Sequence, residues 1–266
     1  MKEQILELWK LKINYKEFSP KKTDFSSDED TSFADILILH WWGGKSDSWV
    51  EVAEKISEKW FKVIVPDLPW FWKTEITKVY NLSDYAQVVE EFCKKLNLEN
   101  IILWWHSNWW AISIVLENRW KIDIERLVLN NSAGIRNDEK RSKKRKILSF
   151  VIKNLKFLKK IFIFKKIRIL FYKAIWWHDY LNAEKSPFLK QTYLNMISSD
   201  LQEKIKEIKL DTLIIWGEKD TYTPLSDWTF MRNNIKNSRM SVLDNETHWI
   251  HIKNPDRLVD TFLKNI

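Results

Sequence analysis

The 266 residues are predicted to form an α/β domain with a mostly parallel central sheet, helices on both faces and a helical insert. Two patterns support this prediction. Short apolar runs such as Ile36–Leu39 and Val63–Val65 are typical of strands buried on both faces. Between such runs, segments such as 47–60 carry apolar side chains at helical spacing. With 45% hydrophobic and 30% charged residues, the composition is that of a globular protein.

The remaining elements continue this alternation. Residues 5–18 and 33–39 are expected to form two strands of an opening hairpin or meander, joined by the polar loop 19–31. Ser83 is expected to cap a helix that buries Tyr85 and Phe92. Further strands are expected over 63–65, 101–104, 127–130, 212–215 and 240–243. Further helices are expected over 108–118, from about Leu225 and over 255–264.

The alternation breaks between residues 133 and 209, where the pattern is mainly helical. We therefore expect a core formed by residues 1–132 and 210–266, with residues 133–209 inserted as a cap. The cap is strongly basic, because residues 136–173 contain 15 Lys or Arg and only two acidic side chains. The whole chain has a net charge of +8, so the expected core is slightly acidic.

Apolar and basic side chains alternate within residues 147–171 at the spacing of an amphipathic helix. One interpretation is a cap that covers the active site with its apolar face and keeps its lysines in water. Another is docking of residues 140–173 on an anionic membrane surface, which would suit a lipid substrate. Nucleic-acid binding is disfavoured, because aromatic stacking platforms and a known binding motif are both missing from the sequence.

Several classes of protein are excluded. Cys93 is the only cysteine, which excludes internal disulfide bonds and a cysteine-built metal site, and we expect its thiol to be buried on a helix. None of the five histidines has a spacing typical of zinc or iron sites, and no cofactor is expected. No apolar run approaches the roughly 18 residues of a membrane span. Because the first residues lack the features of a signal peptide, we expect a cytoplasmic location.

Residues 101–111, IILWWHSNWWA, combine strand character, a turn centred on Ser107 and the start of a helical pattern. A serine hydroxyl is a weak nucleophile until a neighbouring imidazole takes its proton, and the imidazole needs an orienting carboxylate. Asp220 follows the strand 212–215, and His248 follows the strand 240–243. Both stand at strand ends, where open α/β sheets gather their ligands. Ser107, Asp220 and His248 are therefore the candidate catalytic residues.

Two rivals remain open for the acid and the base. Glu218 lies two residues closer to its strand than Asp220, and His251 lies three residues beyond His248. The oxyanion of the transition state also needs backbone N–H donors. We expect one donor at Asn108, directly after the candidate nucleophile, and the second at Trp42, in the loop after strand 36–39.

Four motifs resemble those of the α/β-hydrolase superfamily, in particular its small bacterial members with a helical cap. LHWWGG (39–44) resembles LHGWGG, PDLPWFWKT (66–74) resembles PDLPGFGKS, and WWHSNWWA (104–111) resembles VGHSNGGA. LIIWGEKDTYTP (213–224) matches the family's acid loop without change. The resemblance implies a serine hydrolase that cleaves a carboxylic ester, or a related acyl or carbon–carbon bond, through an acyl-enzyme. A hydrolase-fold binding or receptor protein without turnover is the alternative, and neither the substrate nor the oligomeric state follows from the sequence.

Tryptophan stands where these motifs have glycine. A chain of this length would carry roughly 19 glycines at the average frequency of about 7%, yet it has 4 glycines and 17 tryptophans. Our hypothesis is that UGA codons read as glycine in the cell have been translated as tryptophan. The suspected glycine positions are Trp41, Trp60, Trp70, Trp72, Trp105, Trp109, Trp110, Trp120 and Trp228. Genuine tryptophans are expected at Trp42, Trp49, Trp216 and Trp249, and Trp9, Trp104, Trp176 and Trp177 remain unassigned.

Overall fold

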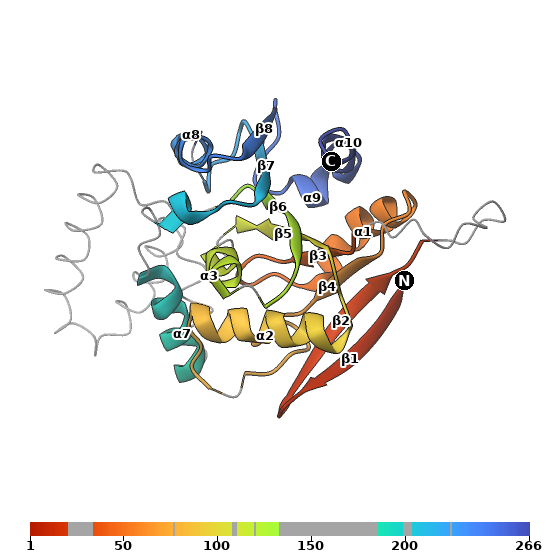
Figure 1. The fold of residues 1–266 in the computed structure, drawn as a ribbon, viewed down its shortest axis with the longest axis vertical. Helices are drawn as coiled ribbons and strands as arrows, with labels where there is room; N and C mark the ends of the chain where they lie inside the picture. The colour runs from red at the N-terminus through yellow and green to blue at the C-terminus, as the bar shows by residue number, and fades with distance from the viewer. Residues whose placement is uncertain are drawn as a thin grey trace, which may run out of the picture.

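The computed structural model describes residues 1–20, 34–76, 78–107, 111–119, 121–132, 186–198, 204–223 and 225–266. Within these ranges, eight strands form one sheet in the order β1-β2-β4-β3-β5-β6-β7-β8 (Figure 1). The strands are β1 (Lys2–Leu8), β2 (Leu11–Phe18), β3 (Ile36–Leu39), β4 (Val63–Pro66), β5 (Ile101–His106), β6 (Ile124–Asn130), β7 (Asp211–Gly217) and β8 (Ser238–Leu243). All neighbours from β4 to β8 are parallel, and only β1 and β2 are antiparallel to their neighbours. The predicted mostly parallel α/β sheet is confirmed.

Helices cover both faces of this sheet, so each central strand is buried on both sides. Among the described residues they are the 3₁₀ turns η1 (Ser46–Trp49) and η4 (Lys204–Glu207) and the α-helices α1 (Val50–Ser57), α2 (Leu82–Lys95), α3 (Ala111–Arg119), α7 (Pro187–Ser198), α8 (Leu225–Asn234), α9 (Ile250–Lys253) and α10 (Pro255–Leu263). Apolar side chains of α2, α3 and α8 pack on one face, and those of α1, α9 and α10 pack on the other (Figure 1). The central strands are therefore held between two hydrophobic layers.

The first strand prediction was wrong, because residues 5–18 are interrupted by a turn. β1 and β2 pair with each other through the two-residue loop Trp9–Lys10, and β2 also pairs with β4. Trp9 has a φ of 54°, at the loop position where a type II′ hairpin turn takes glycine. β3 does not join this hairpin but lies between β4 and β5, parallel to both. Because a tryptophan stands at the turn position that usually carries glycine, the hairpin could not be recognised from the sequence.

The helix predicted after Ser83 begins earlier than expected. Asn81 is its N-cap: the Asn81 side chain accepts from the Asp84 N–H at 3.0 Å, and the Asp84 carboxylate accepts from the Asn81 N–H at 2.9 Å. This reciprocal capping box satisfies two backbone donors that the helix itself leaves unpaired. As expected, α2 buries Cys93, and burial raises the pKa of the Cys93 thiol to about 12.

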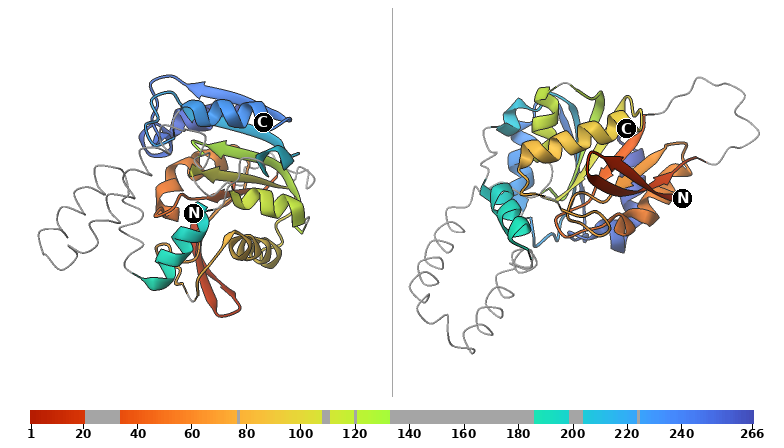
Figure 2. Two further views of the ribbon diagram at one scale, coloured as in Figure 1. Left: turned by 90° about the vertical axis from the view of Figure 1, so that its left-hand side faces the viewer. Right: turned by 90° about the horizontal axis from the view of Figure 1, so that it is seen from below.

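Most of the predicted cap lies outside the described residues, including the whole basic segment 140–173. Of the range 133–209, the structure describes α7, η4 and the residues beside them. α7 lies beside the start of α2 (Figures 1 and 2), where Thr192 Oγ1 accepts from the Tyr80 N–H and the Asn195 side chain donates to the Tyr80 carbonyl. The division into core and cap remains a prediction.

Candidate active site

Ser107 directly follows the buried strand β5. Its side chain is almost wholly buried, and its backbone has a φ of 62°, in the left-handed region. For a residue other than glycine this conformation costs about 1–3 kcal/mol, and such strain concentrates at active sites. α3 begins at Ala111. The residues between, Asn108, Trp109 and Trp110, lie outside the described part of the chain, so the predicted turn there remains a prediction.

Asp220 and His248 meet at the same edge of the sheet. His248 Nδ1 lies 2.7 Å from Asp220 Oδ2, and both side chains are buried. A carboxylate only accepts hydrogen bonds, so Nδ1 carries a hydrogen, and in the neutral ring the other nitrogen, Nε2, is then an acceptor. This tautomer is the one that a general base beside a serine requires.

The loop after β7 holds the Asp220 carboxylate in place. Its Oδ1 atom accepts from the backbone N–H groups of Tyr222 and Thr223, at 2.7 and 2.9 Å, and its Oδ2 atom also accepts from the Thr223 hydroxyl. Gly217 starts this loop, and a Cβ atom there would lie 2.6 Å from the Glu246 carbonyl oxygen. Only glycine therefore permits the loops that carry Asp220 and His248 to pack so closely.

The two rival residues have other partners. Glu218 accepts from the Asn245 N–H at 3.0 Å on the protein surface. His251 is stacked on Trp49, with ring centroids 4.5 Å apart and an angle of 14° between the ring planes. Burial and the neighbouring His248 lower the pKa of His251 to about 3, which keeps this ring neutral. The structure thus brings together Asp220 and His248, and neither rival.

The loop after β3, in which Trp42 is the expected oxyanion donor, is anchored by His40 and Asp67. His40 Nε2 accepts from the Leu68 N–H at 3.2 Å, and His40 Nδ1 donates to the Trp41 carbonyl at 2.8 Å. Asp67 accepts from the Ser46 N–H at 2.7 Å. Burial lowers the pKa of His40, in agreement with a neutral ring that both donates and accepts. Because Asn108 is not described, the pair of donors remains a prediction.

Sequence reasoning missed two residues beside His248. The Tyr222 ring stacks on the His248 ring at 4.9 Å, and the Asn131 side chain binds the backbone just before His248. Asn131 follows the predicted strand 127–130, so its place at a strand end was a usable signal. Tyr222 lies in the acid loop and offered only its nearness in sequence to Asp220.

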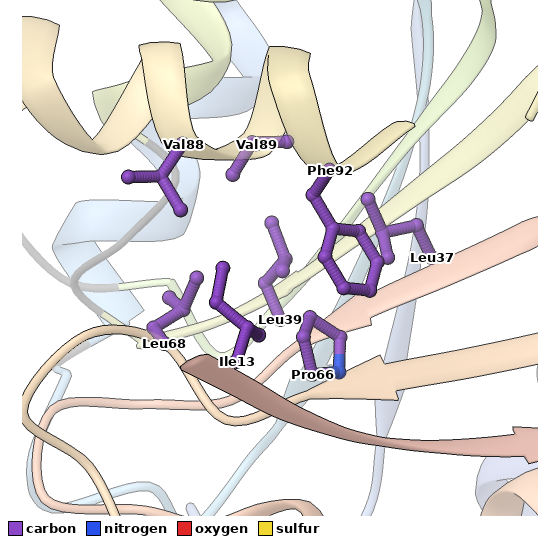
Figure 3. A pocket seen from close by; sticks show the side chains of 8 residues that line it. All are labelled: Ile13, Leu37, Leu39, Pro66, Leu68, Val88, Val89 and Phe92. Carbon is purple, nitrogen blue, oxygen red and sulfur yellow. The ribbon is translucent and has the colours of Figure 1, made fainter. Parts of the chain in front are cut away.

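Other features of the described residues do not compete with this site. A gap of about 10 Å³ between the sheet and α2 is lined by Ile13, Leu37, Leu39, Pro66, Leu68, Val88, Val89 and Phe92 (Figure 3). It is wholly apolar and large enough for no more than about one water molecule, so it is a packing gap. The described residues contain no cluster of three or more metal-ligating side chains in a suitable arrangement. No helix among them has the length and hydrophobicity needed to cross a bilayer.

Comparisons with known proteins agree with this architecture. Residues 36–107 match the family described as alpha/beta hydrolase fold. The chain is 24% identical over 253 residues to a Pseudomonas putida protein named 2-hydroxy-6-oxononadienedioate/2-hydroxy-6-oxononatrienedioate hydrolase 1, covering 86% of this chain and 87% of that protein. The fold of the present chain resembles that of a bacterial membrane phospholipase A (TM-score 0.72, 19% identity, 99% of this chain and 84% of that chain). It also resembles an esterase from Exiguobacterium antarcticum (TM-score 0.71, 18% identity, 96% and 95% of the two chains).

These similar proteins are named as a hydrolase, a phospholipase and an esterase, which is consistent with a hydrolytic enzyme. The chain therefore has the α/β-hydrolase fold.

Proposed function

We propose that the protein is a serine hydrolase that cleaves a carboxylic ester, or a related acyl or carbon–carbon bond, with Ser107, Asp220 and His248 as its catalytic triad. The observation that carries the proposal is the buried hydrogen bond between Asp220 and His248. Ser107 stands at the same sheet edge in a strained conformation, and the adjacent His106 ring is 4.8 Å from the His248 ring. The hydrolase from Pseudomonas putida, as a relative, supports the same class of reaction.

The proposed reaction has two steps. His248 Nε2 takes the proton of the Ser107 hydroxyl as its oxygen attacks the substrate carbonyl, and the resulting oxyanion accepts hydrogen bonds from the backbone N–H groups of Trp42 and Asn108. The protonated His248 then gives its proton to the leaving group, which departs and leaves an acyl group on Ser107. His248 next deprotonates a water molecule, which attacks the acyl group. The protonated His248 then returns the proton to Ser107 Oγ as the acyl–oxygen bond breaks, which releases the acid and regenerates the serine. Asp220 orients the imidazole throughout and is not itself protonated.

A fluorophosphonate probe tests this proposal. It should label the protein, and Ser107→Ala should abolish the labelling and lower ester turnover by about a thousandfold or more. The matched control is Ser113→Ala, which removes another buried serine hydroxyl on α3. This control should retain labelling. If wild type is folded but unlabelled, the alternative of a binding protein without turnover is favoured instead.

We also propose that the suspected tryptophans are glycines in the cell. Nine described non-glycine residues have a left-handed backbone: Trp9, Trp60, Trp70, Trp72, Asn97, Asn100, Ser107, Asn131 and Asn245. Asparagine commonly adopts this conformation, whereas a bulky residue there is an outlier. None of the four tryptophans expected to be genuine is left-handed. The left-handed φ supports glycine at Trp60, Trp70, Trp72 and the previously unassigned Trp9.

The backbone gives no such support at three other suspected positions. Trp41 and Trp105 do not have a positive φ, and Trp228 lies within α8. At Trp41 and Trp105 the proposal rests on the motifs, and at Trp228 it rests on its expected place near a helix end. Sequencing the gene tests the nine suspected positions and Trp9, since UGG codons throughout would overturn the proposal.

Docking of the basic cap on an anionic membrane remains a second proposal. The similar fold of a membrane phospholipase A favours it, but the fold alone does not carry an activity. Co-sedimentation with vesicles of anionic or neutral lipid tests it at low and at moderate salt. Binding to anionic vesicles that falls with salt is expected, and no binding at low salt would exclude it.

A further inference from the structure

The candidate base is carried by the segment 244–249 between β8 and α9, here termed the base loop. Two consecutive carbonyl groups of this loop are bound by side chains from neighbouring strand ends. Asn131 Nδ2, after β6, donates to the Thr247 carbonyl oxygen at 3.0 Å. His106 Nε2, at the end of β5, donates to the His248 carbonyl oxygen at 3.0 Å. The backbone on both sides of the His248 α-carbon is thus attached to the sheet.

The Asn131 side-chain amide makes hydrogen bonds to two different loops. Its Oδ1 atom accepts from the Gly217 N–H at 2.9 Å, at the start of the loop that carries Asp220. Its own backbone N–H donates to the Ile215 carbonyl at 3.0 Å. The side chain is fully buried, and the backbone has a φ of 46°, which asparagine tolerates better than most residues. Asn131 therefore connects the acid loop to the base loop.

His106 connects the candidate nucleophile to the candidate base. A carbonyl oxygen can only accept, so His106 Nε2 carries the hydrogen and the ring is in one defined tautomer. The ring is fully buried, and burial holds the pKa of His106 well below its usual range, so the ring stays neutral. Because His106 directly precedes Ser107, the same strand end fixes the nucleophile and one carbonyl of the base loop.

We propose that His106 and Asn131 are positioning residues that set the distance and direction of the His248 imidazole relative to Ser107 and Asp220. The inference rests on the proposed serine hydrolase function. Displacing a reacting group by about 1 Å can cost about a hundredfold in rate. Neither residue touches substrate in this role, because each acts through a backbone carbonyl beside His248.

Substitutions of similar shape separate positioning from folding. Asn131→Asp retains an acceptor for the Gly217 N–H but puts an oxygen where Nδ2 donates to Thr247. His106→Leu removes the donor to the His248 carbonyl, whereas His106→Gln supplies an amide N–H at a similar reach. The matched control is Thr212→Val at the opposite end of β7, which deletes a partly buried hydrogen bond of 2.9 Å from Thr212 Oγ1 to the Leu210 carbonyl.

The full chain is assayed with a chromogenic ester, and active sites are counted with the fluorophosphonate. For Asn131→Asp and His106→Leu, kcat per titrated site should fall about 10- to 100-fold, with KM nearly unchanged. His106→Gln should recover most of this loss, and Thr212→Val should match wild type per titrated site. Wild-type kcat in both disruptive variants would overturn the positioning role. If Asn131→Asp does not fold, the comparison of His106→Leu with His106→Gln decides in the same way.

An NMR measurement distinguishes failure of this inference from failure of the proposed function. If wild type is not labelled, the serine hydrolase proposal fails, but exchange of the His248 Nδ1 hydrogen with solvent still reports the position of the ring. Exchange should be at least tenfold faster in Asn131→Asp and His106→Leu than in wild type, with Thr212→Val unchanged. Equal exchange rates in all four proteins would overturn the inference.

Discussion

Replacing Trp60 by glycine should stabilise the protein, although such a large-to-small change ordinarily destabilises. Trp60 follows the end of α1, has a φ of 73° and is 42% exposed. Trp60 lies two residues beyond the C-cap Glu58, and the left-handed residue that ends a helix is usually glycine. Relief of left-handed strain is worth about 1–2 kcal/mol, and the greater freedom of glycine in the unfolded chain offsets about 0.5–1 kcal/mol of that. The expected net gain is therefore about 0.5–1 kcal/mol.

Urea denaturation at pH 7 measures this gain, with Trp60→Ala as the decisive comparison. Alanine retains the Cβ atom that causes the strain, so the glycine variant should be more stable than the alanine variant by about 1 kcal/mol. Trp49→Gly is the matched control at the other end of the same helical segment. Trp49 is fully buried and expected to be genuine, so its loss should cost at least about 3 kcal/mol. An alanine variant as stable as the glycine variant would show that the left-handed backbone at residue 60 stores no such strain.

Three further predictions concern single side chains. Hydrogen bonds from Lys73 and Lys16 lower the pKa of Glu3 to about 2, so the stability that Glu3 contributes is present above pH 4.5 and is lost as the pH falls through 2; Glu3→Gln should flatten the urea midpoint against pH in that window, and an unchanged slope would contradict this. The Cys93 thiol should resist iodoacetamide at pH 8 in the native protein and react in urea, because burial raises its pKa to about 12; rapid alkylation of native protein would show that the thiol is accessible. Asp220→Asn should lower kcat by about 10⁴-fold through loss of the required His248 tautomer. If Glu218→Gln lowered kcat equally, Glu218 would replace Asp220 as the candidate acid of the triad.

Much of the fold could be predicted because buried parallel strands have a strong local signature. β3, β4 and β5 are continuous apolar runs, and their positions were predicted to within a few residues. The opening hairpin was missed because its turn depends on the left-handed backbone of Trp9. A tryptophan in the sequence does not predict such a turn, whereas a glycine would. The helix cap was predicted two residues too late, at Ser83 instead of Asn81, because serine and asparagine are equally good capping residues.

The candidate site was predictable as far as strand ends and chain order determine it. Asp220 and His248 were expected at strand ends, and the structure brings them within hydrogen-bond distance. The role of Asn131 in joining two loops was not predictable, because its partners Gly217 and Thr247 are distant in sequence. Side-chain hydrogen bonds to backbone carbonyls leave no pattern in the partner sequence, since every residue has a carbonyl.

Ser107 is proposed to be a nucleophile in a turn flanked by glycines. Trypsin cleavage after Lys95 and Arg119 releases this turn as the single peptide Leu96–Arg119. Mass spectrometry of this peptide, from natural protein treated with fluorophosphonate, is the most direct test. We expect a probe adduct on Ser107 and a mass that is lower by the difference between tryptophan and glycine at positions 105, 109 and 110. An unmodified Ser107 in folded protein would contradict the catalytic claim, and tryptophan masses at all three positions would contradict the glycine assignment.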